Sequence, residues 1–167
     1  MEKDTIAINT ELWEQLQSDP TYKKQLNKIM KTELNELNPE FLGFVQFYYY
    51  LSLILPKNRT IYDLGCANAP QSYYFKDYKQ YIGVDLLTNT NCRIRTPNST
   101  HYKTSIDEYI KKHKIEECHF AFCCYVPPWR NDNEKLVREH FKHIFVYYPM
   151  NTLETHININ NKITVGA

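Results

Sequence analysis

The chain has 167 residues, with 20 basic and 19 acidic side chains and a formal net charge of +1. That length is enough for one domain with a substantial core. The balanced charge excludes a whole-protein field that would attract nucleic acid, although a local basic patch stays open. The N-terminus lacks the basic and then apolar pattern of a signal peptide, and the apolar segment 41–55 is too short and too polar to span a bilayer. We therefore expect a cytoplasmic protein with a single domain, 1–167, made of a helical cap (1–58) and a core (59–167).

The cap is predicted to be helical. Asp19-Pro20 separates a first helix from a second, and Asn38-Pro39-Glu40 has the capping residue, proline and acid that favour the start of a third. The third helix is apolar nearly all round, so its aromatic run Phe47 to Tyr50 indicates core packing rather than a platform for stacking bases. The expected helices are 11–18, 21–37 and 39–55.

From residue 59 onward, short apolar runs alternate with helical patterns. This order predicts an α/β fold with a mostly parallel sheet and helices on both of its faces, and ligands bind such sheets at the carboxyl ends of the strands. The expected strands are 60–64, 81–85, 101–103, 119–125 and 143–148, with an edge strand at 92–95 and a final hairpin of 156–159 and 162–165. The expected helices are 70–77, 106–113 and 131–141.

The stretch from Thr60 to Leu86 carries the strongest signal. Its first strand ends in Asp63-Leu64-Gly65, small residues follow, and its second strand ends in Asp85. Small residues let the backbone approach a ligand, and a carboxylate after the second strand can accept hydrogen bonds from the two hydroxyls of a ribose. Asp63 and Asp85 lie 22 residues apart, close to the ~20 typical of a nucleotide-binding βαβ unit. This spacing fits an NAD-type site as well as other nucleotide sites.

The cysteines and histidines do not indicate a metal site. Five cysteines, an odd number, occur without a Cys-x-x-Cys pair, which favours free thiols in a reducing compartment over disulfides or zinc. Cys123 and Cys124 lie on a predicted core strand, where packing is the simpler role. The six histidines show no ligand spacing.

Three segments together resemble one known family. Asp63-Leu64-Gly65-Cys66-Ala67-Asn68-Ala69, Gly83-Val84-Asp85 and Val126-Pro127-Pro128-Trp129 are similar to motifs of the class I S-adenosylmethionine-dependent methyltransferases, over about residues 59–150. The resemblance implies a Rossmann-like methyltransferase fold and S-adenosyl-L-methionine as cofactor. It implies that the first loop passes the methionine part, that the second acid holds the ribose and that later residues meet adenine. The implied cofactor-binding residues are Asp63, Gly65, Cys66, Ala67, Asn68, Asp85, Leu86, Ser105 and Ile106.

The resemblance also implies an acceptor site after the strand 119–125. It assigns catalysis to Tyr125, Pro127, Pro128 and Trp129, with methyl transfer to a nitrogen or oxygen acceptor that the sequence does not identify. The family usually has glycine where this chain has alanine in the loop, and Asn, Asp or Ser where it has Val126. The Tyr125 hydroxyl or backbone carbonyls could substitute for the missing acceptor group.

Two alternatives stay open. One is a catalytically degenerate methyltransferase-fold protein that binds or regulates, and the other is an NAD-type nucleotide-binding enzyme. The expected partner is a small-molecule cofactor; no membrane is expected, and nucleic acid is possible but not indicated by the net charge.

Overall fold

A computed structural model describes most of the predicted core. The described residues are 10–19, 21, 24, 39–66, 70–86, 96–115, 120–123, 131–141, 143–148 and 156–159. Most of the expected helix 21–37, the expected edge strand 92–95 and the segment 162–165 lie outside them.

Six strands form one sheet in the order β3-β2-β1-β4-β5-β6. All the neighbouring pairs are parallel except β5 with β6, which is antiparallel. This confirms the predicted α/β class and defines a Rossmann-like fold, in which strand order reverses on either side of β1. The strands are β1 (Thr60–Leu64), β2 (Gln80–Asp85), β3 (Ser99–Lys103), β4 (Phe120–Cys123), β5 (His143–Tyr148) and β6 (His156–Ile159).

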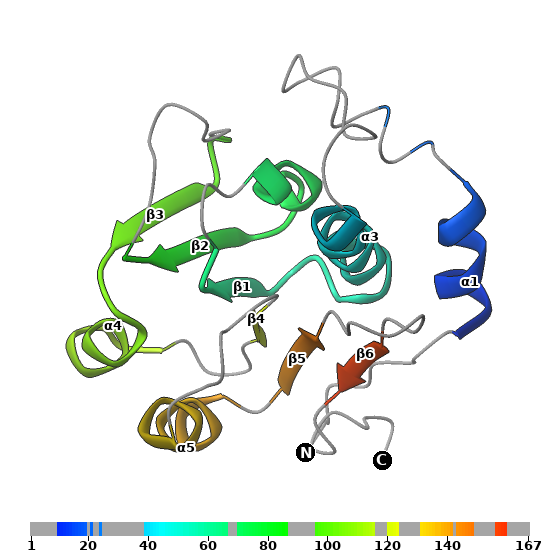
Figure 1. The fold of residues 1–167 in the computed structure, drawn as a ribbon. Helices are drawn as coiled ribbons and strands as arrows, with labels where there is room; N and C mark the ends of the chain where they lie inside the picture. Colours follow the sequence, from blue (N-terminus) through cyan, green and yellow to red (C-terminus); the bar gives the residue numbers. More distant parts are fainter. Residues whose placement is uncertain are drawn as a thin grey trace, which may run out of the picture.

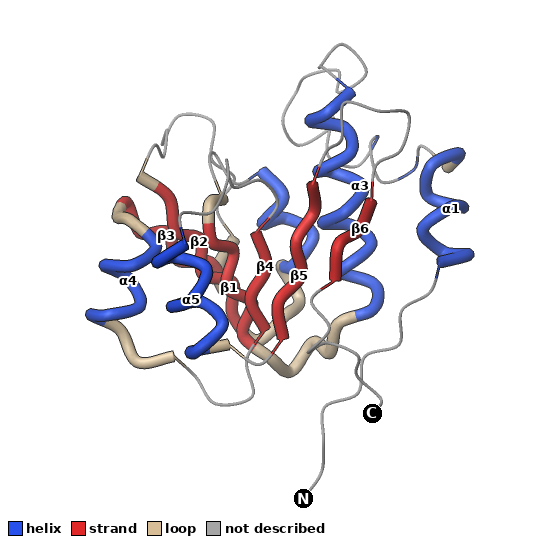
Figure 2. The backbone as a smooth tube through the Cα atoms, turned by 60° about the horizontal axis from the view of Figure 1, so that its bottom comes forward, coloured by secondary structure: helices blue, strands red, loops and turns tan. Residues whose placement is uncertain are grey.

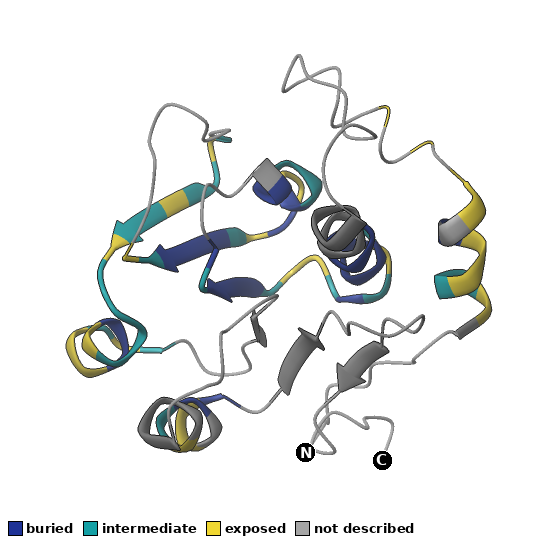
Figure 3. Cartoon of the chain, in the orientation of Figure 1, coloured by how far each residue is buried: buried dark blue, intermediate teal, exposed yellow. Residues whose placement is uncertain are grey.

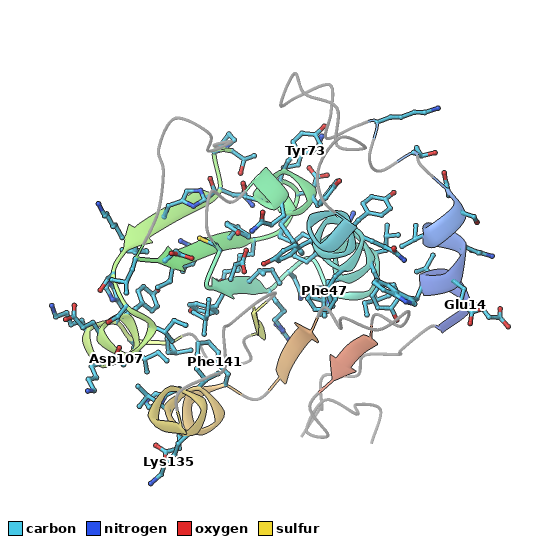
Figure 4. All side chains as sticks on the ribbon, viewed as in Figure 1. Glu14, Phe47, Tyr73, Asp107, Lys135 and Phe141 are labelled. Atoms are coloured by element: carbon cyan, nitrogen blue, oxygen red, sulfur yellow. The ribbon has the colours of Figure 1, made fainter. Side chains whose placement is uncertain are left out.

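Helices cover both faces of the sheet, as predicted (Figures 1 and 2). α3 and η2 lie on one face, α4 and α5 lie on the other, and α1 packs outside α3. Figure 4 shows Phe47 on α3 and Phe141, which follows α5, on opposite sides of β1. The helices are α1 (Thr10–Ser18), α3 (Pro39–Ile54), η2 (Pro70–Phe75), α4 (Ile106–Lys112) and α5 (Asn131–His140).

Alternation along β1 separates the two faces. The Tyr62 ring meets Phe141 with ring centroids 5.2 Å apart, on the side of α4 and α5, whereas the carboxylate of Asp63 meets a side chain of α3. Successive side chains of a strand point to opposite faces, so this division follows from the pleat. Asp63 therefore lies beneath α3 and η2.

The described core is unusually aromatic, and among the strands whose burial is described, β1 and β2 are more buried than β3 (Figure 3). Burying one large apolar side chain stabilises a fold by roughly 1.5–3 kcal/mol. The prediction that the aromatic run of α3 packs in the core is confirmed. The largest fully buried side chains are Tyr48, Tyr50, Tyr81, Phe47 and Phe75.

The expected α-helix over 70–77 is instead a 3₁₀-helix that ends at Phe75. Its last turns are closed by bonds from the N–H of Lys76 to the carbonyl of Tyr73 and from that of Tyr78 to the carbonyl of Phe75, both three residues apart. The side-chain amide of Asn98 donates to the carbonyls of Phe75 and Tyr78, both at 2.9 Å. Asn98 thus satisfies carbonyls at and just beyond the C-terminal end of η2, which have no partner within the helix.

The tail segment His156–Ile159 pairs with β5, with Phe145 opposite Ile159. Its partner in the described structure is therefore β5; the hairpin partner expected from the sequence, 162–165, lies outside the described residues. No helix within the described ranges is long and apolar enough to cross a membrane.

Candidate functional site

The carboxyl ends of β1, β2 and β3 are tied together at Val84 and Asp85. Gly65 follows β1 with a φ of 86°, a conformation that glycine adopts without strain. The N–H groups of Gly65 and Cys66 both donate to the carbonyl of Val84, at 2.7 and 3.2 Å. The N–H of Thr104, after β3, donates to the carbonyl of Asp85 at 3.2 Å. The first two residues after β1 are therefore hydrogen-bonded to β2 at Val84, one residue before Asp85, the acid that ends β2.

Asp63 is completely buried, with 0% of its surface exposed. The Tyr48 hydroxyl of α3 donates to its Oδ1 at 2.8 Å, and the Gln71 amide of η2 donates to its Oδ2 at 2.9 Å. The Tyr81 hydroxyl of β2 also donates to Oδ2. Both carboxylate oxygens are thus engaged by donors from three different elements.

Burial dominates the ionisation of Asp63. Desolvation raises its pKa to about 7, because an apolar surrounding disfavours the charged form. The hydrogen bonds from Tyr81, Gln71 and Tyr48 act in the opposite direction, and the charge of Asp85 adds a small further rise. The network therefore holds a carboxyl group that titrates near neutral pH.

Gly83 allows close packing beside this network. In the sheet register it pairs with Asp63 on one side and with His101 on the other. A Cβ at this position would lie 2.8 Å from the Nδ1 of His101 and 2.9 Å from the Sγ of Cys66. The thiol of Cys66 is buried. The missing side chain is what lets the imidazole and the thiol approach the same point of β2.

Asp85 and Leu86 differ from Asp63 in their exposure. Asp85 is half-buried, and the next side chain, Leu86, is 58% exposed. A carboxylate next to an exposed apolar side chain can accept hydrogen bonds from a ribose while the apolar group covers a base. These two residues lie at the carboxyl end of β2, next to β1, and ligands of this fold class bind at the carboxyl ends of the strands.

Ser105 and Ile106 begin α4 at the same edge. The Ser105 hydroxyl accepts a hydrogen bond from the N–H of Glu108 at 3.3 Å and so caps the helix. A hydrogen bond with Ser105 also lowers the pKa of Asp107, which Figure 4 shows on α4. Ile106 is half-buried against the core. The Ser105 hydroxyl is therefore used as the N-cap of α4. Ile106 is only partly buried, so a ligand could contact the exposed part of its side chain.

The structure brings together the described part of the predicted cofactor set at one edge of the sheet: Asp63, Gly65, Cys66, Asp85, Leu86, Ser105 and Ile106. The other predicted site residues lie outside the described residues: Ala67, Asn68, Tyr125, Pro127, Pro128 and Trp129. The individual roles assigned to both groups remain predictions.

Sequence reasoning missed Tyr48, Gln71 and Tyr81, which surround Asp63. The only available signal was general: an acid inside a buried strand requires hydrogen-bond donors. By residue type, any of the chain's 14 tyrosines was an equally plausible donor. Among the described residues, no group of three or more metal-ligating side chains gathers.

The residues at this edge fit the nucleoside part of S-adenosylmethionine better than its methionine part. The nucleoside half meets an accessible acid and an exposed apolar side chain, Asp85 and Leu86. The backbone turn at Gly65 leaves room for a close approach. The carboxylate of Asp63, which the family resemblance assigns to the methionine end, is instead engaged by three protein donors.

No protein-family model matches the chain, and no curated protein matches it. Two solved structures resemble its fold. One is a candidate type II methyltransferase from Anaeromyxobacter dehalogenans, with 15% identity and a TM-score of 0.44, covering 66% of this chain and 48% of that one. The other is a candidate S-adenosylmethionine-dependent methyltransferase from Listeria monocytogenes, with 16% identity and a TM-score of 0.44, covering 70% of this chain and 67% of that one.

This chain thus spans about half the length of the first of these proteins. At such scores and identities, the likenesses carry no information about what the chain binds or does. The class defined by its own strand order is that of a Rossmann-like α/β protein.

Proposed function

We propose that the chain binds S-adenosylmethionine at the carboxyl ends of β1 to β3 and transfers its methyl group to a nitrogen or oxygen acceptor. One observation carries this proposal. The loop after β1 is hydrogen-bonded to Val84 through two consecutive N–H groups, next to the accessible acid Asp85. The βαβ layout thus puts a turn that can approach a ligand beside a ribose-binding carboxylate.

Within this proposal, Asp85 accepts hydrogen bonds from the ribose hydroxyls, and Leu86 and Ile106 cover the adenine. The bound cofactor supplies an electrophilic methyl group. The protein contributes orientation, which can account for a large share of the rate enhancement in a two-substrate reaction. Tyr125, Pro127, Pro128 and Trp129 are proposed to line the acceptor side.

Calorimetric titration with S-adenosylmethionine tests the binding step. Wild type is expected to bind, and Asp85→Asn is expected to weaken binding about tenfold or more, because hydrogen bonds to a charged group contribute roughly 1.5–3 kcal/mol. The matched control is Asp77→Asn, which removes an exposed carboxyl outside the site. No heat and no thermal shift at millimolar ligand would refute the proposal. Equal affinities of Asp85→Asn and wild type would remove Asp85 from it.

The engagement of Asp63 by three protein donors favours a second candidate, a protein that binds the nucleoside without transferring a methyl group. With that carboxylate occupied, fewer groups are left to orient the methionine end. The two candidates separate in one assay with methyl-labelled cofactor. Transfer of label to a nucleic-acid, protein or small-molecule pool supports the enzyme, whereas binding without transfer supports the second candidate.

A further inference from the structure

We propose that Gln71 is a positioning residue that fixes the loop after β1 in its ligand-binding arrangement. The side chain lies on η2 and is 6% exposed. Its Nε2 donates to Oδ2 of Asp63 at 2.9 Å and to the carbonyl of Cys66 at 3.0 Å. A primary amide has two N–H groups, so one side chain joins the end of the strand to the loop. The link to a ligand rests on the function proposed above.

The Cys66 backbone is held from two sides. Its N–H donates to Val84 on β2, and its carbonyl accepts from Gln71 on η2. Gly65, one residue earlier, has the permissive backbone of a glycine and would otherwise act as a pivot. Gln71 therefore fixes the carbonyl of Cys66 and, with Val84, the orientation of this residue's backbone after the glycine.

The amide of Gln71 is itself held in place by Asp63. That carboxylate also accepts hydrogen bonds from Tyr48 on α3 and Tyr81 on β2, so it cannot turn to follow a displaced amide. In its ionised form this carboxylate only accepts hydrogen bonds, and this directs the NH₂ end of Gln71 toward it. The result is a continuous chain of hydrogen bonds from α3 through Asp63 and Gln71 to the loop carbonyl.

The consequence for ligand binding concerns the amino-acid end of an S-adenosyl compound. Backbone N–H and C=O groups bind a zwitterionic amino acid more tightly when they are fixed beforehand, because ordering a loop on binding weakens affinity. Gln71 provides that order without touching the ligand. Its removal should therefore loosen the loop and lower affinity together.

The test compares Gln71→Met with Gln46→Met. Met has a similar length but no donor. Gln46 is a matched control, since it is 7% exposed and donates to a backbone carbonyl, that of Trp13 at 2.9 Å, on the outer side of α3. Two quantities are measured: hydrogen exchange at the amides of Gly65 and Cys66, relative to the amide of Phe141, and the dissociation constant of S-adenosylhomocysteine.

Gln71→Met is expected to raise exchange at the two loop amides about tenfold and to raise the dissociation constant about tenfold, whereas Gln46→Met changes neither relative to wild type. Gln71→Lys, which keeps donors for both acceptors, is expected to restore loop protection to within about threefold. If Gln71→Met does not fold, Gln71→Asn replaces it, because its shorter amide reaches at most one of the two acceptors.

Unchanged exchange at Gly65 and Cys66 in Gln71→Met would overturn the proposal, as would faster exchange with unchanged affinity. Failure of the proposed function looks different. Wild type would then bind no S-adenosylhomocysteine, which removes the ligand role, while the exchange comparison would still decide whether Gln71 fixes the loop.

Discussion

Asp63→Asn should remove a large pH dependence from the stability of the protein. The folded state raises the pKa of Asp63 from its ordinary 3.8 to about 7, chiefly through burial. For an acid whose pKa is raised on folding, the stability contribution is fully present below the unfolded pKa and is lost as the pH rises through the folded pKa. Wild type should therefore lose stability relative to Asp63→Asn between about pH 4 and pH 7.

The structure sets the size of this loss. Each pH unit between the two pKa values corresponds to about 1.4 kcal/mol, so the interval from 3.8 to about 7 gives up to about 4 kcal/mol. Above pH 7 the difference between the two proteins should level off, because Asp63 is then ionised in both the folded and the unfolded state. Folding lowers the pKa values of Asp19 and Asp107, so these acids make the protein more stable as the pH rises. Both acids are present in wild type and in Asp63→Asn, so their effect cancels in the difference between the two proteins.

Urea unfolding followed by circular dichroism, at half-unit steps from pH 4 to pH 8, measures this difference. The relevant quantity is the unfolding free energy of wild type minus that of Asp63→Asn. Asp77→Asn gives the baseline for losing an exposed carboxyl. A difference that stays constant with pH, or that grows in favour of wild type as the pH rises, would refute the reasoning. It would mean that the hydrogen bonds from Tyr48, Gln71 and Tyr81 outweigh desolvation.

Three further substitutions test the packing around the site. Gly83→Ala should destabilise the fold by roughly 1–3 kcal/mol. The alanine Cβ would lie 2.8 Å from Nδ1 of His101 and 2.9 Å from Sγ of Cys66. An unchanged midpoint of thermal unfolding would contradict that geometry. Tyr48→Phe removes one hydrogen-bond donor from Asp63. It should lower the free energy of unfolding by about 1.5–3 kcal/mol above pH 7, and by less at pH 5, where the carboxyl is protonated. Urea unfolding at both pH values checks this, and equal losses would count against it. Ser105→Ala removes the cap of α4 and should cost about 0.5–2 kcal/mol in chemical unfolding, whereas Ser105→Asp should retain most of it.

The positions of the strands could be predicted because a buried strand has a recognisable pattern of apolar residues in the sequence. Parallel strands covered on both faces are continuous apolar runs, and β1 and β5 have the predicted bounds, 60–64 and 143–148. The parallel order then followed from the alternation of strands and helices. The pairing of β6 could not be inferred in this way, since a short terminal strand can add to any open edge and local sequence does not choose one.

The 3₁₀-helix shows a different limit. Pro70 and the residues after it match the start of an α-helix equally well. The carbonyls of Phe75, at the end of η2, and of Tyr78, just beyond it, are bound by the side-chain amide of Asn98. Asn98 lies more than twenty residues away from Phe75 in the sequence, so no local pattern contains this information. The segment's own residues predict a helical turn, but they do not show where it ends or which distant side chain binds its last carbonyl.

The two acids of the βαβ unit show that the sequence also does not distinguish an enclosed acid from an accessible one. Asp63 and Asp85 look alike in sequence, each at the end of an apolar run. In the structure, Asp63 is enclosed by donors from α3, η2 and β2, whereas Asp85 remains accessible beside Leu86. A carboxylate that already satisfies three donors has little capacity left for a ligand, and displacing them would leave buried polar groups unpaired. Under the proposed function, Asp85 is the acid that recognises the nucleoside, and Asp63 contributes by holding the amide of Gln71.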